Sequence, residues 1–150
     1  MITIKKTSLL FLSLVAITIL AGCGPEPTDD AIPFAPFPPM VIQLNNPQYQ
    51  DLSIKGYVEL TGIGVKGVIL HRVNASTYHA YERNCSFQPN TACALVQVDQ
   101  SGLFMIDNCC GSRFDMGTGA PSGGPAWREL RQYVTNLNGT QLTITDEVLN

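Results

Sequence analysis

Turn-forming residues divide the chain from residue 41 onward into short apolar or alternating runs, and no long amphipathic helix interrupts this pattern. The runs lie at residues 41–44, 56–60, 67–73, 77–83, 94–98, 102–106, 131–135 and 141–145. Asn138-Gly139, between the last two runs, is a strong signal for a tight hairpin turn, and Asp99-Gln100-Ser101 separates another pair. Many short strands at this spacing predict an all-β domain.

Two details of the pattern give local predictions. Asn46 precedes Pro47, which suits the cap and the first position of a single helical turn. The run at 77–83 is expected to be a strand, in which successive side chains point to opposite faces. Its two faces are then Tyr78, Ala80 and Glu82 on one side, and His79, Tyr81 and Arg83 on the other.

The N-terminal segment has the order of an export signal, with a positive start, an apolar run and small residues. Lys5 and Lys6 precede an apolar run at residues 9–20, which is too short to span a bilayer as a mature helix. The run ends in Leu20-Ala21-Gly22-Cys23, which resembles the lipobox of bacterial lipoproteins. That resemblance implies that residues 1–22 are a cleaved signal peptide and that Cys23 carries acyl chains. An ordinary secretory signal with an incidental Cys23 is the alternative.

Two or three acyl chains anchor a protein stably, so we expect a lipid-anchored protein in the bacterial cell envelope, outside the cytoplasm. The next segment, residues 23–40, carries prolines at positions 25, 27, 33, 36, 38 and 39. Proline at this density disfavours helices and central strands, which predicts a semi-rigid linker or a disordered tail. Residues 41–150 are enough for one compact domain.

The charge of the chain argues against one class of partner. The formal net charge is −3, and cleavage of the signal peptide would remove Lys5 and Lys6 and leave the mature chain more acidic. The sequence has no basic patch or arginine-rich run, which argues against nucleic acid as a partner. The partners that we expect are the membrane, through the lipid anchor, and a protein of the cell envelope.

Four cysteines lie within the expected domain: Cys85, Cys93, Cys109 and Cys110. An even number in an exported chain usually indicates disulfides, and adjacent cysteines rarely bond each other because a vicinal bridge is strained. Two bridges from the 85–93 segment to the 109–110 pair are therefore expected, with the pairing open. The spacing disfavours a tetrahedral zinc site, and a reactive redox thiol would have only Arg113 close in sequence to activate it.

Several segments resemble a Rieske domain in order and spacing, and the similarity covers most of residues 41–150. They are YHAYERNC at 78–85, CCGSRFDMGTG at 109–119, GGPAWRELRQY at 123–133 and GTQLTI at 139–144. Rieske domains bind a 2Fe–2S cluster through two cysteines and two histidines. The resemblance implies three stacked antiparallel β-sheets with two cysteine-bearing loops at one tip. In the high-potential members of the family, an extra cysteine in each loop forms a disulfide that links the two loops.

This sequence departs from the family pattern where the two histidines belong. Cys85 falls on the first ligand, but Phe87 stands at the position of the first histidine. In the second loop, Asp107 falls on the ligand cysteine and Cys110 on the second histidine. The resemblance therefore identifies a degenerate branch of the family, a group of lipoproteins with a Cys-Cys-Gly-Ser box.

The remaining residues complete this interpretation. The chain's two histidines, His71 and His79, lie in predicted strands before either loop and are expected to be structural. The resemblance places Cys93 and Cys109 on the family's disulfide cysteines. It also places Cys85 and Cys110 on facing ligand positions, so without a cluster we expect these two to form the second bridge. We therefore expect a structural or binding module clamped by two disulfides, with no cluster, no other metal and no catalytic residue.

Two other functions stay open. The first is a Rieske-type electron-transfer protein, or a subunit of a redox complex, with a 2Fe–2S cluster that uses Cys85 and Cys110 as ligands. The second is a thiol–disulfide redox protein or a copper- or zinc-handling protein that uses the adjacent Cys109 and Cys110.

Overall fold

The computed structural model describes residues 30–150. The expected signal peptide (residues 1–22), the lipidated Cys23 and linker residues 24–29 lie outside the described residues, so these expectations stay predictions. Within residues 30–150, no helix has both the length and the apolar character that a membrane crossing requires.

The described part of the chain is almost entirely β-structure, which confirms the predicted all-β class. Its elements are β1 (Met40–Gln43), η1 (Pro47–Tyr49), α2 (Asp51–Ile54), β2 (Tyr57–Leu60), β3 (Val68–Arg72), β4 (Tyr78–Glu82), β5 (Val96–Val98), β6 (Phe104–Asp107), β7 (Arg113–Asp115), β8 (Pro121–Gly123), β9 (Gln132–Asn138) and β10 (Gln141–Val148). The predicted helical turn is present as η1, where the Asn46 side chain accepts a hydrogen bond from the Gln48 backbone N–H. The predicted hairpins β5–β6 and β9–β10 are also present.

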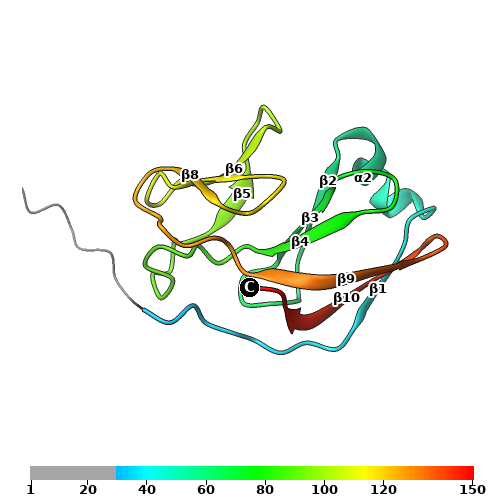
Figure 1. Cartoon of the computed structure of the whole chain (residues 1–150), viewed down its shortest axis with the longest axis horizontal. Helices are drawn as coiled ribbons and strands as arrows, with labels where there is room; N and C mark the ends of the chain where they lie inside the picture. The colour runs from blue at the N-terminus through cyan, green and yellow to red at the C-terminus, as the bar shows by residue number, and fades with distance from the viewer. Residues whose placement is uncertain (1–29) are drawn as a thin grey trace, which may run out of the picture.

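The strands form two antiparallel sheets, which occupy different ends of the molecule (Figure 1). One sheet has the strand order β1-β10-β9-β4-β3-β2, and the other has the order β5-β6-β7-β8. The resemblance implied three stacked sheets. In this domain two of the three are joined into the six-stranded sheet, because β9 pairs both with β10 and with β4. The β4–β9 pairs are Ala80–Tyr133 and Tyr81–Gln132.

Buried apolar side chains form two cores on opposite sides of the central strands β3 and β4. The first core comprises Phe37, Ile42, Leu52, Leu60, Val68, Leu70, Tyr78, Ala80, Tyr133, Leu142 and Ile144. The second core comprises Ile69, Tyr81, Cys85, Phe87, Ala94, Val96, Met105, Phe114, Met116, Ala126 and Leu130, and it joins the four-stranded sheet to the larger one. The predicted alternation along β4 is confirmed, since Tyr78 and Ala80 enter the first core and Tyr81 the second.

The proline-rich segment lies against the domain from residue 30 onward (Figure 1). Phe37 is buried and its ring meets the Tyr133 ring edge-on, with centroids 5.1 Å apart. The Arg131 guanidinium donates hydrogen bonds to the backbone carbonyls of Ile32 and Pro33. A chain without regular secondary structure is thus held by apolar contact and by hydrogen bonds to its carbonyl oxygens.

Glu82, at the end of β4, connects parts of the chain that are distant in sequence. Its side chain is fully buried, and its carboxylate accepts hydrogen bonds of 2.8–3.0 Å from the backbone N–H groups of Val65, Lys66 and Asn84 and from the hydroxyl of Tyr133. Burial and the adjacent carboxylate raise the pKa of Tyr133. A buried carboxylate is tolerated here because several donors compensate its lost hydration.

We predict that Glu82→Gln destabilises the domain by about 3 kcal/mol, because the amide removes the charge and turns an N–H₂ group toward donors that need an acceptor. Equilibrium unfolding in denaturant measures this loss. Glu147→Gln is the matched control, since Glu147 is exposed and its substitution is expected to be close to neutral. Equal stability of the two variants would contradict the role given to Glu82.

Candidate functional site

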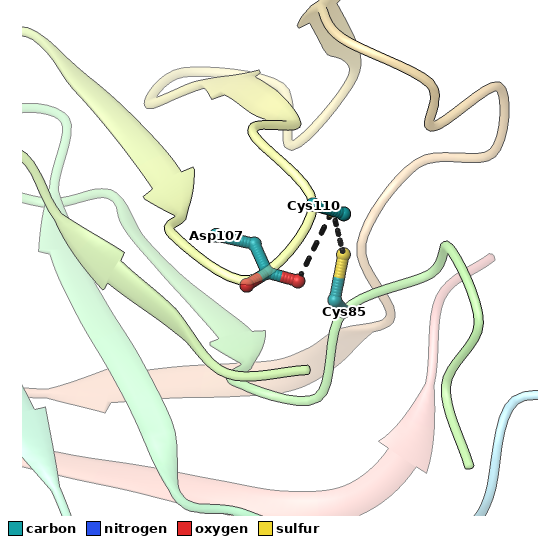
Figure 2. Close-up of side chains that lie close together, drawn as sticks. All are labelled: Cys85, Asp107 and Cys110. Atoms are coloured by element: carbon teal, nitrogen blue, oxygen red, sulfur yellow. Dashed lines mark hydrogen bonds between the residues drawn. The ribbon is translucent and has the colours of Figure 1, made fainter. Parts of the chain in front are cut away.

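Two loops meet at one tip of the domain and bring the domain cysteines together. The first follows β4 and carries Cys85 and Cys93, and the second connects β6 to β7 and carries Cys109 and Cys110. Figure 2 shows Cys85 on the first loop facing Cys110 and Asp107 on the second. The arrangement agrees with the expected tip of two cysteine-bearing loops.

The second loop is a tight turn that is closed by backbone hydrogen bonds. The Gly111 N–H donates to the Asp107 carbonyl at 2.8 Å, and the Asp107 N–H donates to the Ser112 carbonyl at 2.9 Å. Gly111 has φ of +77°, a conformation that favours glycine. The turn carries Cys109, which is bonded to Cys93, and Cys110, whose sulfur lies 3.9 Å from that of Cys85.

Ser112 and the turn at Gly124 support this loop from below. The Ser112 hydroxyl is fully buried, accepts a hydrogen bond from the Ala126 N–H at 3.1 Å and lies 3.0 Å from the Cys110 sulfur. The backbone of Gly124 passes so close to the loop that an added Cβ would lie 2.6 Å from the Gly111 carbonyl oxygen. The position of Cys110 is therefore fixed by packing of backbone against backbone.

A disulfide between Cys93 and Cys109 joins the two loops, as the resemblance implied. The Cα atoms of the two residues are 5.6 Å apart, and they are separated by 16 residues in sequence. Closing a loop of this size contributes about 3 kcal/mol to stability by restricting the unfolded chain. Both cysteines lie at exposed positions.

The other two cysteines are thiols in this structure, with their sulfur atoms 3.9 Å apart. The expected Cys85–Cys110 bridge is therefore not formed here, because the sulfurs lie well beyond bonding distance, and the pairing stays a prediction. Asp107 completes the group: its Oδ2 lies 3.3 Å from the Cys110 sulfur (Figure 2). The two sulfurs and a carboxylate oxygen all lie within 4.8 Å of one another.

Burial differs among these three side chains. Cys85 and Asp107 are fully buried, whereas Cys110 is partly exposed. Burial, together with the nearby Asp107 carboxylate, raises the pKa of the Cys85 thiol. The other Asp107 oxygen, Oδ1, accepts a hydrogen bond from the Cys109 N–H at 2.8 Å, which leaves Oδ2 facing the sulfurs. The accessible sulfur of the pair is therefore that of Cys110.

Phe87 and the two histidines contribute no donor to this group. Phe87 is buried in the second core, where its ring packs with apolar neighbours. His79 Nδ1 lies 2.8 Å from the Gly117 carbonyl oxygen and 3.0 Å from the Tyr81 hydroxyl, so this side chain is already engaged on β4. His71 lies opposite His79 on β3, and burial lowers its pKa. Neither histidine belongs to the group of donor atoms at the tip.

Known structures support the fold of the domain. The plasma membrane Rieske protein PetC3 from Synechocystis PCC 6803 aligns with a TM-score of 0.50 and 24% identity, over 63% of this chain and 91% of that chain. This domain has a Rieske-like fold. No protein-family model matches the chain, and no curated protein matches its sequence.

Two further solved structures resemble the domain more distantly, and the fold assignment does not depend on them. A complex of oxygenase and ferredoxin in carbazole 1,9a-dioxygenase aligns at a TM-score of 0.47 and 15% identity, over 64% of this chain and 85% of that one. The ferredoxin of carbazole 1,9a-dioxygenase from Nocardioides aromaticivorans IC177 aligns at a TM-score of 0.41 and 18% identity, over 62% of this chain and 86% of that one.

The residues at the tip do not fit a Rieske cluster. Such a cluster needs two thiolates for one iron and two imidazoles for the other. The group at this tip offers the sulfurs of Cys85 and Cys110 and a hard carboxylate from Asp107, and Phe87 offers nothing. Both imidazoles of the chain belong to β3 and β4 and have no place in this group of donors.

Sequence reasoning placed Asp107 on a degenerate ligand position but missed its contacts with both thiols and the supporting role of Ser112. The available signal was the spacing Asp107-x-x-Cys110-x-Ser112 at the end of a predicted strand. Such spacing closes a turn in which the first side chain folds back over the third, as in an Asx-type turn.

We predict that Gly124→Ala destabilises the domain more than Gly139→Ala does. Both glycines have positive φ, +79° and +61°, so both substitutions incur the conformational cost of about 1–2 kcal/mol. Only the Gly124 substitution adds a clash with the second loop, since nothing lies within 4 Å of a Cβ at Gly139. Denaturant unfolding of the two variants compares them directly, and equal losses would contradict the close packing beneath the tip.

Proposed function

We propose that this chain is a lipid-anchored lipoprotein of the bacterial cell envelope whose Rieske-like domain works without a cluster, as a non-catalytic structural or binding module. The donor set at the tip carries the proposal: two sulfurs and one carboxylate oxygen converge, with Phe87 at a position where a ligand is needed. Electron transfer through a 2Fe–2S cluster requires four suitable donors. The partners are then the membrane, through the anchor, and a protein of the envelope.

Two disulfides clamp the loops in this proposal. Cys93–Cys109 is one of them, and Cys85–Cys110 forms the other when its sulfurs approach by about 2 Å to bonding distance. Each thiol loses one proton and one electron as the S–S bond forms, and a disulfide-bearing oxidant of the envelope accepts both pairs. Partly exposed Cys110 is the sulfur that such an oxidant can reach.

The alternative function, electron transfer through a cluster, has one observation in its favour. Cys85, Asp107 and Cys110 occupy three cluster-ligand positions of the resemblance, and their donor atoms converge. Against it stand the missing imidazoles, because a histidine-ligated iron is what gives Rieske centres their raised potential.

We predict that the full chain, purified in detergent without reductant, contains far less than one iron per chain and has no visible absorbance of a cluster. Disulfide mapping is expected to find no free thiol among the four domain cysteines, because both bridges form in an oxidising compartment. The same protein, reduced and alkylated, is the control and should show all four as thiols. An iron content near two per chain, with a red-brown colour, would establish the alternative function.

We also predict that Cys23 carries the lipid. Mass spectrometry of the protein from bacterial membranes should find acyl chains on an N-terminal Cys23, and Cys23→Ser should abolish incorporation of labelled fatty acid. Each buried methylene contributes about 0.8 kcal/mol, so two chains suffice for stable anchoring. Cys110→Ser is the matched control and should retain the lipid. An unmodified Cys23 in the wild type would contradict the lipid anchor and support the alternative of an ordinary export signal.

A further inference from the structure

Two of the three distances among the donor atoms at the tip nearly equal those of a tetrahedral zinc site, and the third, between the Cys85 sulfur and the Asp107 carboxylate, is at most 4.8 Å. With Zn–S bonds of about 2.3 Å, tetrahedral angles place two sulfur ligands about 3.8 Å apart, and a sulfur and an oxygen ligand about 3.5 Å apart. The Cys85 and Cys110 sulfurs are 3.9 Å apart, and Asp107 Oδ2 is 3.3 Å from the Cys110 sulfur. These distances match the edges of the tetrahedron within a few tenths of an ångström.

We propose that the reduced tip binds one zinc ion through Cys85, Cys110 and Asp107, with water at the fourth position. Two thiolates with one carboxylate suit a borderline cation such as Zn²⁺ better than Cu⁺, which prefers sulfur alone, or Mg²⁺, which prefers oxygen alone. Partial exposure of Cys110 gives the ion and its water a path from solvent. The inference goes beyond the proposed function and does not depend on the lipid anchor.

Surrounding hydrogen bonds hold the ligands in the orientation that this site requires. The Cys109 N–H binds Asp107 Oδ1 and leaves Oδ2 directed at the sulfurs. The Ser112 hydroxyl, itself fixed by the Ala126 N–H, lies 3.0 Å from the Cys110 sulfur and can donate to its thiolate. Outer contacts of this kind orient ligands and tune their affinity for the metal.

Charge also favours a cation at this position. The Asp107 side chain is fully buried, and it forms no ion pair with any side chain of residues 30–150. A divalent ion beside the carboxylate would supply the opposite charge that compensates the cost of burying it. On binding, each thiol releases one proton to solvent and forms a Zn–S bond, with no transfer of electrons.

Zinc binding and the second disulfide exclude each other, because both use the same two sulfurs. Oxidation removes the thiolates that ligate the ion, so the Cys85–Cys110 bridge must expel zinc. This gives a test in the wild-type chain that needs no substitution. The reduced full chain in detergent, titrated with Zn²⁺, should bind one ion per chain at the tip, and the fully oxidised chain none there.

Variants separate the tip from the other cysteines. With Co²⁺ as a spectroscopic probe, the reduced wild type should show sulfur-to-metal charge transfer and the visible bands of a tetrahedral ion. Asp107→Asn and Cys110→Ser should each weaken binding by at least about tenfold, because even outer contacts of a metal site typically cost that much. The control variant Cys93→Ser/Cys109→Ser removes the other two thiols and should keep the bands.

Several results would overturn the proposal. They are a reduced wild type without stoichiometric zinc, an oxidised chain that binds as well as the reduced one, or binding lost in the Cys93/Cys109 control and kept in Asp107→Asn. If Cys110→Ser fails to fold by circular dichroism, Asp107→Asn and the oxidised wild type decide the question. A 2Fe–2S cluster in the purified protein would refute the proposed function, whereas zinc titration after reduction tests this inference separately.

Discussion

The tip of this domain depends on one fully buried carboxylate, that of Asp107. Its backbone closes the second loop through Gly111 and Ser112, and its two side-chain oxygens face the Cys109 N–H and the Cys110 sulfur. A carboxylate is costly to bury, so the surrounding donors must stay in place for the fold to keep it there. The loop geometry that presents Cys110 to Cys85 is a consequence of satisfying this group.

Holding two loops together is a task that different chemistries can perform on the same scaffold. A Rieske cluster does so through four ligands, two of them histidines. Here Phe87 extends the second core into the first loop, while the Cys93–Cys109 disulfide joins the loops on the exposed side. In the proposed function, cross-linking and apolar packing replace what metal ligation would contribute to rigidity, without the redox activity of iron.

The sequence was sufficient for the features that depend on local chemistry. Period-two alternation and glycine or asparagine turns predicted the long strands and the Asn138-Gly139 hairpin, because these follow from backbone geometry alone. The three-residue strands β7 and β8 escaped prediction, since such short pairs are set by neighbours rather than by their own pattern. Docking of the proline-rich segment through Arg131 was equally hidden, because carbonyl acceptors carry no sequence signal.

The resemblance identified the ligand positions one at a time, but chemistry at the tip depends on which of them converge. Cys85 and Asp107 are 22 positions apart, and nothing in either segment states the distance between their side chains. Packing of the second core, together with the Cys93–Cys109 disulfide, brings the two loops into contact and places the Cys85 sulfur 3.9 Å from that of Cys110. That separation is too long for a disulfide and suitable for two ligands of one ion, so oxidation or reduction of this thiol pair would decide between the covalent clamp and the proposed metal site.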